Sequence, residues 1–179
     1  MSDPRDTFLP PDLRLGDDDV LEPVEVVGEP EEDEDGSAGS DVPRVSGFDG
    51  VGTRRESRER ALALLYEAEQ KGIEPFADII DALPVPPEAF AGQLVVGVSD
   101  HLAEIDDVIR QYSVGWPLER MPAIDRALLR LGIYELVDTD VPVGACISEA
   151  VELAKRYSTD DSHVFVNGLL GRLAHELRA

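Results

Sequence analysis

Residues 123–137 read Ala123-Ile124-Asp125-Arg126-Ala127-Leu128-Leu129-Arg130-Leu131-Gly132-Ile133-Tyr134-Glu135-Leu136-Val137. Apolar side chains fall on nearly every side of a helix drawn through these residues, a pattern typical of a helix that neighbours surround. The sequence therefore predicts that this helix is the central and most buried one. Its four charged residues must find partners or reach an edge; they are Asp125, Arg126, Arg130 and Glu135.

Amphipathic helices are predicted on both sides of this segment. Downstream, apolar residues at helical spacing predict one helix that ends near Tyr157 and a last one that begins near Ser162. Upstream, the same spacing predicts a helix over residues 54–71 that Gly72 stops, followed by a short helix. One apolar stripe over residues 90–112 predicts a long helix of about six turns.

The first part of the chain has a different composition. The protein has 179 residues and a formal net charge of −22. Residues 1–50 hold 16 Asp or Glu against 3 Arg, a net charge of −13, so the remaining residues carry −9. Segments this rich in like charge bury too little apolar surface to offset the entropy lost on ordering. We expect residues 1–52 to form a disordered acidic tail.

Residues 53–179 are expected to form an all-α domain of six or seven helices packed as two small bundles. The sequence has no basic start followed by an apolar core and no run of 18 apolar residues, so a cytoplasmic protein without membrane contact is expected. Cys146 is the single cysteine, which excludes an internal disulfide and a multi-cysteine metal site.

Enzyme signatures are missing from the sequence. It contains no Gly-rich phosphate loop after a strand, no G-x-S-x-G and no H-E-x-x-H. A metal or acid–base site could be built only from Asp160, Asp161 and His163, with Glu149 and Glu152 on the preceding helix. The competing interpretation is that the polar residues of this turn cap the last helix, and we favour it. We therefore expect no enzyme activity, no cofactor and no metal.

A cluster of arginines opens the first predicted helix. Arg54 and Arg58 share one helix face and Arg55 lies beside them. Guanidinium groups bind phosphates in a bidentate manner, and unstacked RNA bases stack on them. The alternative is that Glu56 and Glu59 pair with these arginines and leave an ordinary solvated face.

Ordered motifs run through most of the chain. They are Arg54-Arg55-x-x-Arg58, Trp116-Pro117-Leu118-Glu119-Arg120-Met121, Ile124-Asp125-Arg126-Ala127-Leu128-Leu129-Arg130, Tyr134-Glu135-Leu136, Ile147-Ser148-Glu149-Ala150-Val151-Glu152-Leu153-Ala154-Lys155, and Asp161-Ser162-His163 with Phe165-Val166-Asn167-Gly168. Together they resemble the NusB family of transcription antitermination factors. The resemblance covers about residues 53–177 and leaves the acidic tail outside.

The resemblance implies a fold and a function. Members of the family are all-helical, are built of two small bundles and are not enzymes. They bind the single-stranded boxA element of ribosomal RNA leader transcripts jointly with a small-subunit ribosomal protein, NusE, and they help RNA polymerase to read through terminators. The same role is implied for this chain.

The resemblance also implies site residues. The implied RNA contacts are Arg54, Arg55, Arg58, Tyr112, Asp161 and Phe165. The implied contacts with the protein partner are Tyr66, Asp125 and Phe165. Relatives differ in being monomeric or dimeric, so a helical protein–protein module or a homodimer that masks its RNA face stays open as an alternative.

This sequence departs from the family pattern at the arginine cluster. Glu56 lies where many relatives extend the basic run, which removes one phosphate contact and adds repulsion. The net charge of the helical part is also negative, which opposes binding of a polyanion by this chain alone. A complex in which the second protein supplies positive charge resolves this conflict.

Overall fold

The computed structural model describes residues 50–177, with side chains from Arg54 onward. These residues form six α-helices and two short 3₁₀-helices. Their bounds are α1 Gly50–Lys71, η2 Phe76–Ile79, α2 Ala89–Asp100, α3 Leu102–Tyr112, η3 Leu118–Arg120, α4 Ala123–Asp138, α5 Val143–Tyr157 and α6 Ser162–Glu176. The predicted acidic tail lies outside the described residues, except that residues 50–52 belong to α1.

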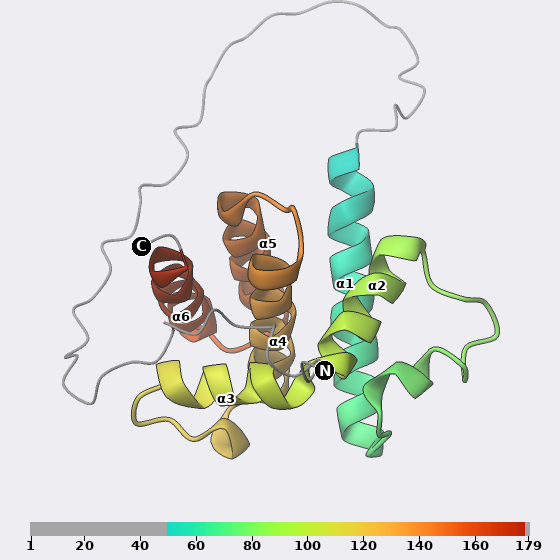
Figure 1. Ribbon diagram of the computed structural model, residues 1–179, viewed down its shortest axis with the longest axis horizontal. Coiled ribbons are helices and arrows are strands. Elements are labelled where there is room, and N and C mark those ends of the chain that lie inside the picture. The colour runs from blue at the N-terminus through green and yellow to red at the C-terminus, as the bar shows by residue number, and fades with distance from the viewer. Residues whose placement is uncertain (1–49, 178–179) are drawn as a thin grey trace, which may run out of the picture.

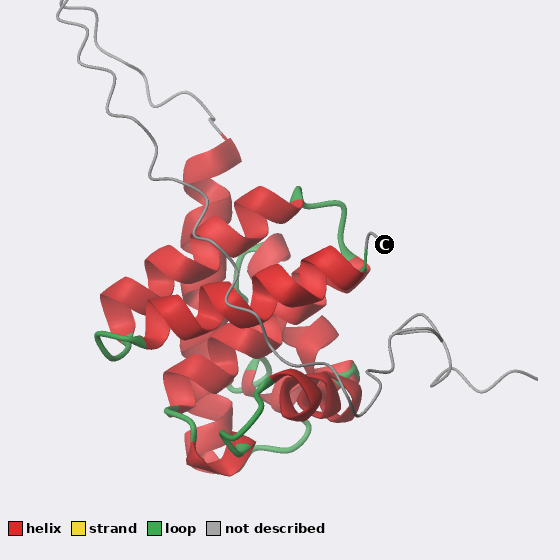
Figure 2. Ribbon diagram, turned by 90° about the vertical axis from the view of Figure 1, so that its left-hand side faces the viewer, coloured by secondary structure: helices red, strands yellow, loops and turns green. Residues whose placement is uncertain are grey.

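The helix α4 lies at the centre of the molecule, as its sequence predicts. It contacts α1, α2, α3, α5 and α6, and ten of its residues are buried. Figure 1 shows α1 and α2 on one side of α4 and α5 and α6 on the other, with α3 running across one end. Figure 2 shows helices joined by loops and no strand among the described residues. The all-α prediction with two small bundles is confirmed.

The four charged residues between Asp125 and Glu135 of α4 find partners inside the protein. Each partner comes from another part of the chain, so these polar groups join the central helix to the segments around it. The pairs are Asp125 with Ser158 and Ser162, Arg126 with Glu69, Arg130 with Asp106, and Glu135 with Arg58. These contacts satisfy most of the hydrogen-bonding groups that burial would otherwise leave costly. Arg130 Nη1 makes no hydrogen bond but lies 3.2 Å from Oε2 of Glu69, as an ion pair.

The first helix ends where the sequence predicts. Gly72 has a φ of +64°, a left-handed conformation that glycine adopts without strain. The backbone N–H of Gly72 donates to the carbonyl of Glu69 at 3.1 Å, and that of Ile73 donates to Ala68 at 2.9 Å. This pair of bonds is the Schellman ending, which satisfies carbonyls that the helix leaves free.

The predicted long helix over residues 90–112 is wrong in one respect, because the structure divides it into α2 and α3. His101 lies between them with φ −113° and ψ 22°, outside helical values. The apolar spacing continues across this residue from Val98 to Leu102, so periodicity alone does not detect the bend. The short helix predicted after Gly72 is present as the 3₁₀-helix η2.

Glycine allows α2 to approach α4 closely. A Cβ atom added to Gly97 would lie 2.0 Å from Cζ of Tyr134, so the tyrosine ring lies directly against the glycine. Tyr134 is buried there. The contact fixes the position of α2 next to the central helix.

Candidate nucleic-acid interface

The arginines that open α1 lie in three different surroundings. Arg54 is exposed, and the Arg55 side chain retains 47% exposure. Arg58 is 4% exposed. The shared helix face that the sequence predicts therefore contains two arginines at the surface and one inside the protein.

Arg58 pairs with Glu135 of α4. Its Nε donates to the two carboxylate oxygens at 2.9 and 3.0 Å, and its Nη2 donates to Oε1 at 2.7 Å. Burial raises the pKa of Glu135, and the hydrogen bond from Arg58 opposes that shift. The predicted RNA contact at Arg58 does not agree with this burial, because the guanidinium is already occupied between α1 and α4.

Arg54 lies against an aromatic ring. Its Cζ is 5.2 Å from the centroid of the Phe90 ring, and that of Arg58 is 5.6 Å from the same centroid. These are cation–π distances. Among the described residues Arg54 has no ion-pair partner, so its charge is available to a ligand.

A pocket of about 470 Å³ opens beside Arg54, between α2 and the end of α4. Its lining residues are Arg54, Phe90, Gln93, Val137, Asp138, Thr139, Asp140 and Val141. Two aspartates at the carboxyl end of a helix make a negative surrounding that disfavours phosphate. The pocket itself is therefore not suited to phosphate, although Arg54 lies in its wall.

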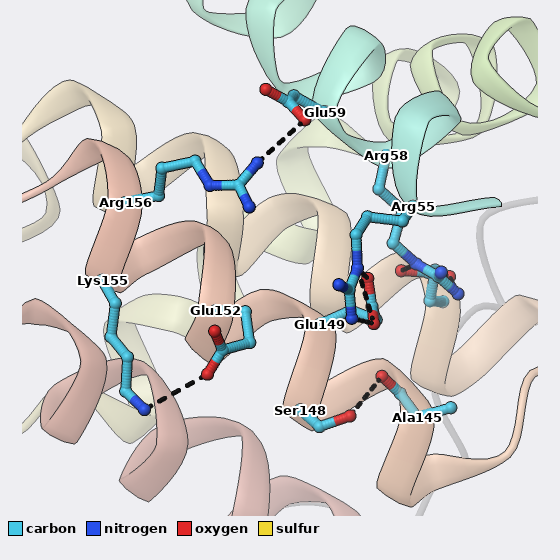
Figure 3. A network of polar contacts seen from close by, with 10 residues as sticks. Arg55, Arg58, Glu59, Ala145, Ser148, Glu149, Glu152, Lys155 and Arg156 are labelled. Atoms are coloured by element: carbon cyan, nitrogen blue, oxygen red, sulfur yellow. Dashed lines mark hydrogen bonds and ion pairs between the residues drawn. The ribbon is translucent and has the colours of Figure 1, made fainter. Parts of the chain in front are cut away.

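Arg55 pairs with a carboxylate of α5. Its Nε donates to the Glu149 oxygens at 3.2 and 2.9 Å, and its Nη2 donates to Oε1 at 2.6 Å. The hydrogen bond from Arg55 lowers the pKa of Glu149, and the Glu149 contact raises the pKa of Arg55. Figure 3 shows this pair between α1 and α5, beside the Arg58 side chain.

The glutamates within the cluster do not occupy its arginines. Glu59 of α1 accepts instead from Arg156 of α5 at 3.3 Å (Figure 3). It also accepts from the Tyr157 hydroxyl of α5. Glu56 is exposed. The alternative in which Glu56 and Glu59 pair with the arginines of α1 is therefore wrong for Arg55 and Arg58, whose partners come from α5 and α4.

The polar turn between α5 and α6, residues 158–163, is bound from the interior of the protein by Asp125 of α4. This residue is 0% exposed, and its carboxylate accepts from the Ser158 hydroxyl at 2.5 Å and the Ser162 hydroxyl at 2.8 Å. The predicted surface contact with a protein partner does not agree with this burial. Asp125 instead positions the turn that carries Asp161.

Asp161 and Phe165 lie at the start of α6. Asp161 is the N-cap residue by position, but its exposed side chain makes no capping hydrogen bond. Phe165 is half-buried, and its ring packs on Trp116 with centroids 4.6 Å apart and planes tilted by 56°. The turn thus exposes the Asp161 carboxylate, which makes no capping hydrogen bond. The aromatic pair of Phe165 and Trp116 lies at the start of the same helix.

Tyr112 belongs to the interior of the protein. It is 4% exposed, its hydroxyl donates to Glu176 of α6, and the Arg172 guanidinium lies 5.5 Å from its ring centroid. Burial, supported by the Glu176 carboxylate, raises the pKa of Tyr112 well above its ordinary value. The predicted stacking of an RNA base on this ring does not agree with its burial.

Two further residues from the sequence analysis are placed by the structure. Tyr66, a predicted partner contact, is 38% exposed on α1. Cys146 is buried, its thiol donates to the Gly132 carbonyl at 3.4 Å, and burial raises its pKa. This environment is that of an inert packed thiol.

Within the described residues no three of His, Cys, Asp and Glu are arranged to hold a metal ion, and this includes the polar turn. None of the described helices combines the length and apolar composition that a bilayer crossing requires.

The sequence does not predict three of the residues that surround the arginines of α1. Glu135 and Glu149 lie 77 and 94 positions away from the arginines that they bind, so no local pattern links them. Phe90 carries only a core signal in the sequence, although its ring lies beside Arg54. The sequence contains one indication of the Arg58–Glu135 pair. Glu135 lies on a helix that is predicted to be buried, so its carboxylate requires a basic partner.

The arginine cluster and the polar turn both fall within the match to a known family. The family model described as the NusB family matches residues 55–175, which is more than half of the chain. The match begins within the arginine cluster and ends one residue before the end of α6. The chain belongs to the NusB family.

Relatives in this family carry a common name. The transcription antitermination protein NusB of Kineococcus radiotolerans is 48% identical over 128 residues, which cover 69% of this chain and 94% of the relative. The protein of the same name from Thermobifida fusca is 48% identical over 127 residues, covering 68% and 89%. The similarity therefore spans nearly the whole of these NusB proteins.

Solved NusB structures share the fold. T. maritima NusB superimposes with a TM-score of 0.63 at 36% identity, covering 69% of this chain and 91% of that one. A chain from a crystal structure of the antitermination factors NusB and NusE in complex with dsRNA gives a TM-score of 0.58 at 27% identity, covering 69% and 96%. The helical arrangement described above is thus the NusB arrangement.

Proposed function

We propose that this protein is a transcription antitermination factor that binds single-stranded boxA-type RNA of ribosomal RNA leader transcripts jointly with the ribosomal protein NusE. Family membership supports the role, because the relatives are named for it. The neighbouring structure that holds NusB, NusE and RNA supports the pair of partners. In this role the protein works within the RNA polymerase antitermination complex.

The observation that carries the proposal is the start of α1. There Arg54 and Arg55 expose positive charge on a chain whose net charge is −22. Cationic side chains that neutralise phosphates release counterions, which gives affinity without sequence preference. We propose that these two arginines provide the phosphate contacts, whereas Arg58 holds α1 in place through Glu135.

The polar turn supplies the second RNA contact in this proposal. Phe165 offers a ring, supported by Trp116, on which an unstacked base can stack. Asp161 repels phosphate but can accept from a base amino group, so it favours selectivity over affinity. Tyr112 supports α3 against the end of α6 through Glu176.

We place the NusE contact on Tyr66 of α1 and on Phe165. A half-exposed tyrosine combines a large apolar area with a hydroxyl, which suits a protein interface. Because residues 51–179 carry a net charge of −9, a partner with positive charge is needed to bring RNA close. Asp125 contributes indirectly by fixing the adjoining turn.

The role proposed here is that of an adaptor rather than a catalyst. Its chemistry consists of ion pairing, stacking and protein–protein contact, and it calls for no cofactor and no metal. A factor that acts on nascent ribosomal RNA in bacteria works in the cytoplasm.

The test is the salt dependence of RNA affinity. In the presence of NusE, an Arg54→Ala/Arg55→Ala variant should bind a boxA-type single strand more weakly, with a slope of log affinity against log salt shallower by about 1.4. The matched control is Arg60→Ala/Lys71→Ala, which removes the same charge from α1 at positions that Glu67 faces. Equal slopes for the parent and the Arg54/Arg55 variant would contradict the proposal.

A further inference from the structure

The Arg55 guanidinium already binds an anionic group of the protein through two of its three nitrogens. Both Nε and Nη2 point to the Glu149 carboxylate, with three donor–acceptor distances of 2.6 to 3.2 Å. This is the fork arrangement by which arginine also binds phosphate. An RNA phosphate and Glu149 therefore compete for the same two donors.

The burial of the pair permits this exchange. The Arg55 side chain is 47% exposed and that of Glu149 is 12% exposed, so the arginine reaches out from the surface while the carboxylate stays covered. The neighbouring Arg58–Glu135 pair, at 5% and 2%, has no such access to solvent. Arg55 can turn to an external anion, whereas Arg58 cannot.

We infer that Glu149 acts as an internal substitute for RNA phosphate, which holds Arg55 in the free protein and must be displaced when RNA binds. This inference rests on the proposed function. It gives Glu149 the role of a residue that weakens RNA binding by the chain alone. Any added positive surface from NusE then helps RNA to displace it.

The fold does not depend on the Arg55–Glu149 contact. Arg58 and Glu135 still join α1 to the central helix, and Arg156 still joins α5 to Glu59 of α1. Breaking a partly exposed pair costs little. Variants at position 149 should therefore fold.

The experiment compares two glutamates of α5. Glu149→Gln and Glu152→Gln remove the same charge from the same helix, but Glu152 pairs with Lys155 and not with Arg55. Affinity for a boxA-type single strand is measured without NusE. Glu149→Gln should tighten binding about threefold more than Glu152→Gln, the effect of removing one partly exposed competitor. The RNA affinity of Glu149→Ala is measured as well. Glutamine keeps one oxygen that Arg55 can still bind, whereas alanine removes the acceptor completely.

Arg55 itself supplies the decisive control. In an Arg55→Ala background the advantage of Glu149→Gln over Glu152→Gln should disappear. Equal gains for the two glutamine variants, or a gain that survives in the Arg55→Ala background, would overturn the inference while leaving the proposed function intact. A parent protein that binds no RNA even with NusE would overturn both.

Discussion

At the scale of single residues, α1 places three arginines in three electrostatic states within five positions. Arg54 is exposed and lies over Phe90, Arg55 is partly exposed and pairs with the largely covered Glu149, and Arg58 is buried against Glu135. An exposed cation is accessible to a polyanion, whereas removing one member of a buried ion pair leaves an unpaired charge inside the protein. Similar side chains at neighbouring positions of α1 therefore lie in different electrostatic surroundings.

The buried pair gives a stability prediction. Arg58→Met leaves the Glu135 carboxylate buried without its partner, and losing one member of such a pair costs about 3–5 kcal/mol. An Arg58→Met/Glu135→Leu variant should recover most of this loss, because both charges are removed together. The free energy of unfolding by urea is the measurement.

The salt dependence of RNA affinity distinguishes a structural role of Arg58 from a direct contact between Arg58 and RNA phosphate. The folded Arg58→Met/Glu135→Leu protein should keep the RNA salt dependence of the parent. A parental stability for Arg58→Met, together with a shallower salt slope, would mean that Arg58 meets phosphate itself.

The helical spacing places the three arginines close together at the start of α1, but it does not predict their exposure. Arg54, Arg55, Asp161 and Phe165 are at or near the surface, as a binding role requires. Arg58 is buried because its partner comes from α4, and helical spacing on α1 contains no information about that distant carboxylate. Asp125 is buried for a similar reason, since Ser158 and Ser162 reach it from another segment.

At the scale of elements, the apolar pattern predicts α1, α4, α5 and α6 closely, because each has a distinct stripe and a clear end. The separation of α2 from α3 is not predicted. A bend at one residue leaves the apolar spacing on both sides in phase. Both α2 and α3 pack against α4, and a one-dimensional pattern does not contain these contacts.

The contact of α2 with α4 leads to a prediction on two glycines of the same helix. Gly97→Ala should destabilise the protein by about 1–3 kcal/mol, because the new methyl group overlaps the Tyr134 ring. Gly92→Ala is the matched change, since its Cβ would meet only Pro87 at 3.8 Å, and it should stabilise by about 0.5–1 kcal/mol through helix propensity. Thermal unfolding compares the two variants, and equal shifts would contradict the described packing.

At the scale of the whole molecule, charge sets the conditions for binding. The chain is strongly acidic, and its exposed arginines at the start of α1 are few. Long-range repulsion therefore opposes RNA, and the local contacts must be reinforced by a second protein. A joint complex follows from this balance, in agreement with the neighbouring structure that contains NusB, NusE and RNA.

The coupling between the two partners is the quantity on which this account depends. The dissociation constant for a boxA-type single strand should be measured at one fixed salt concentration, with the protein alone and with saturating NusE. We predict that NusE tightens RNA binding at least about tenfold, and that RNA tightens NusE binding by the same factor. Joint binding would be contradicted if the two proteins together bound RNA no more tightly than the better binder of the two does alone.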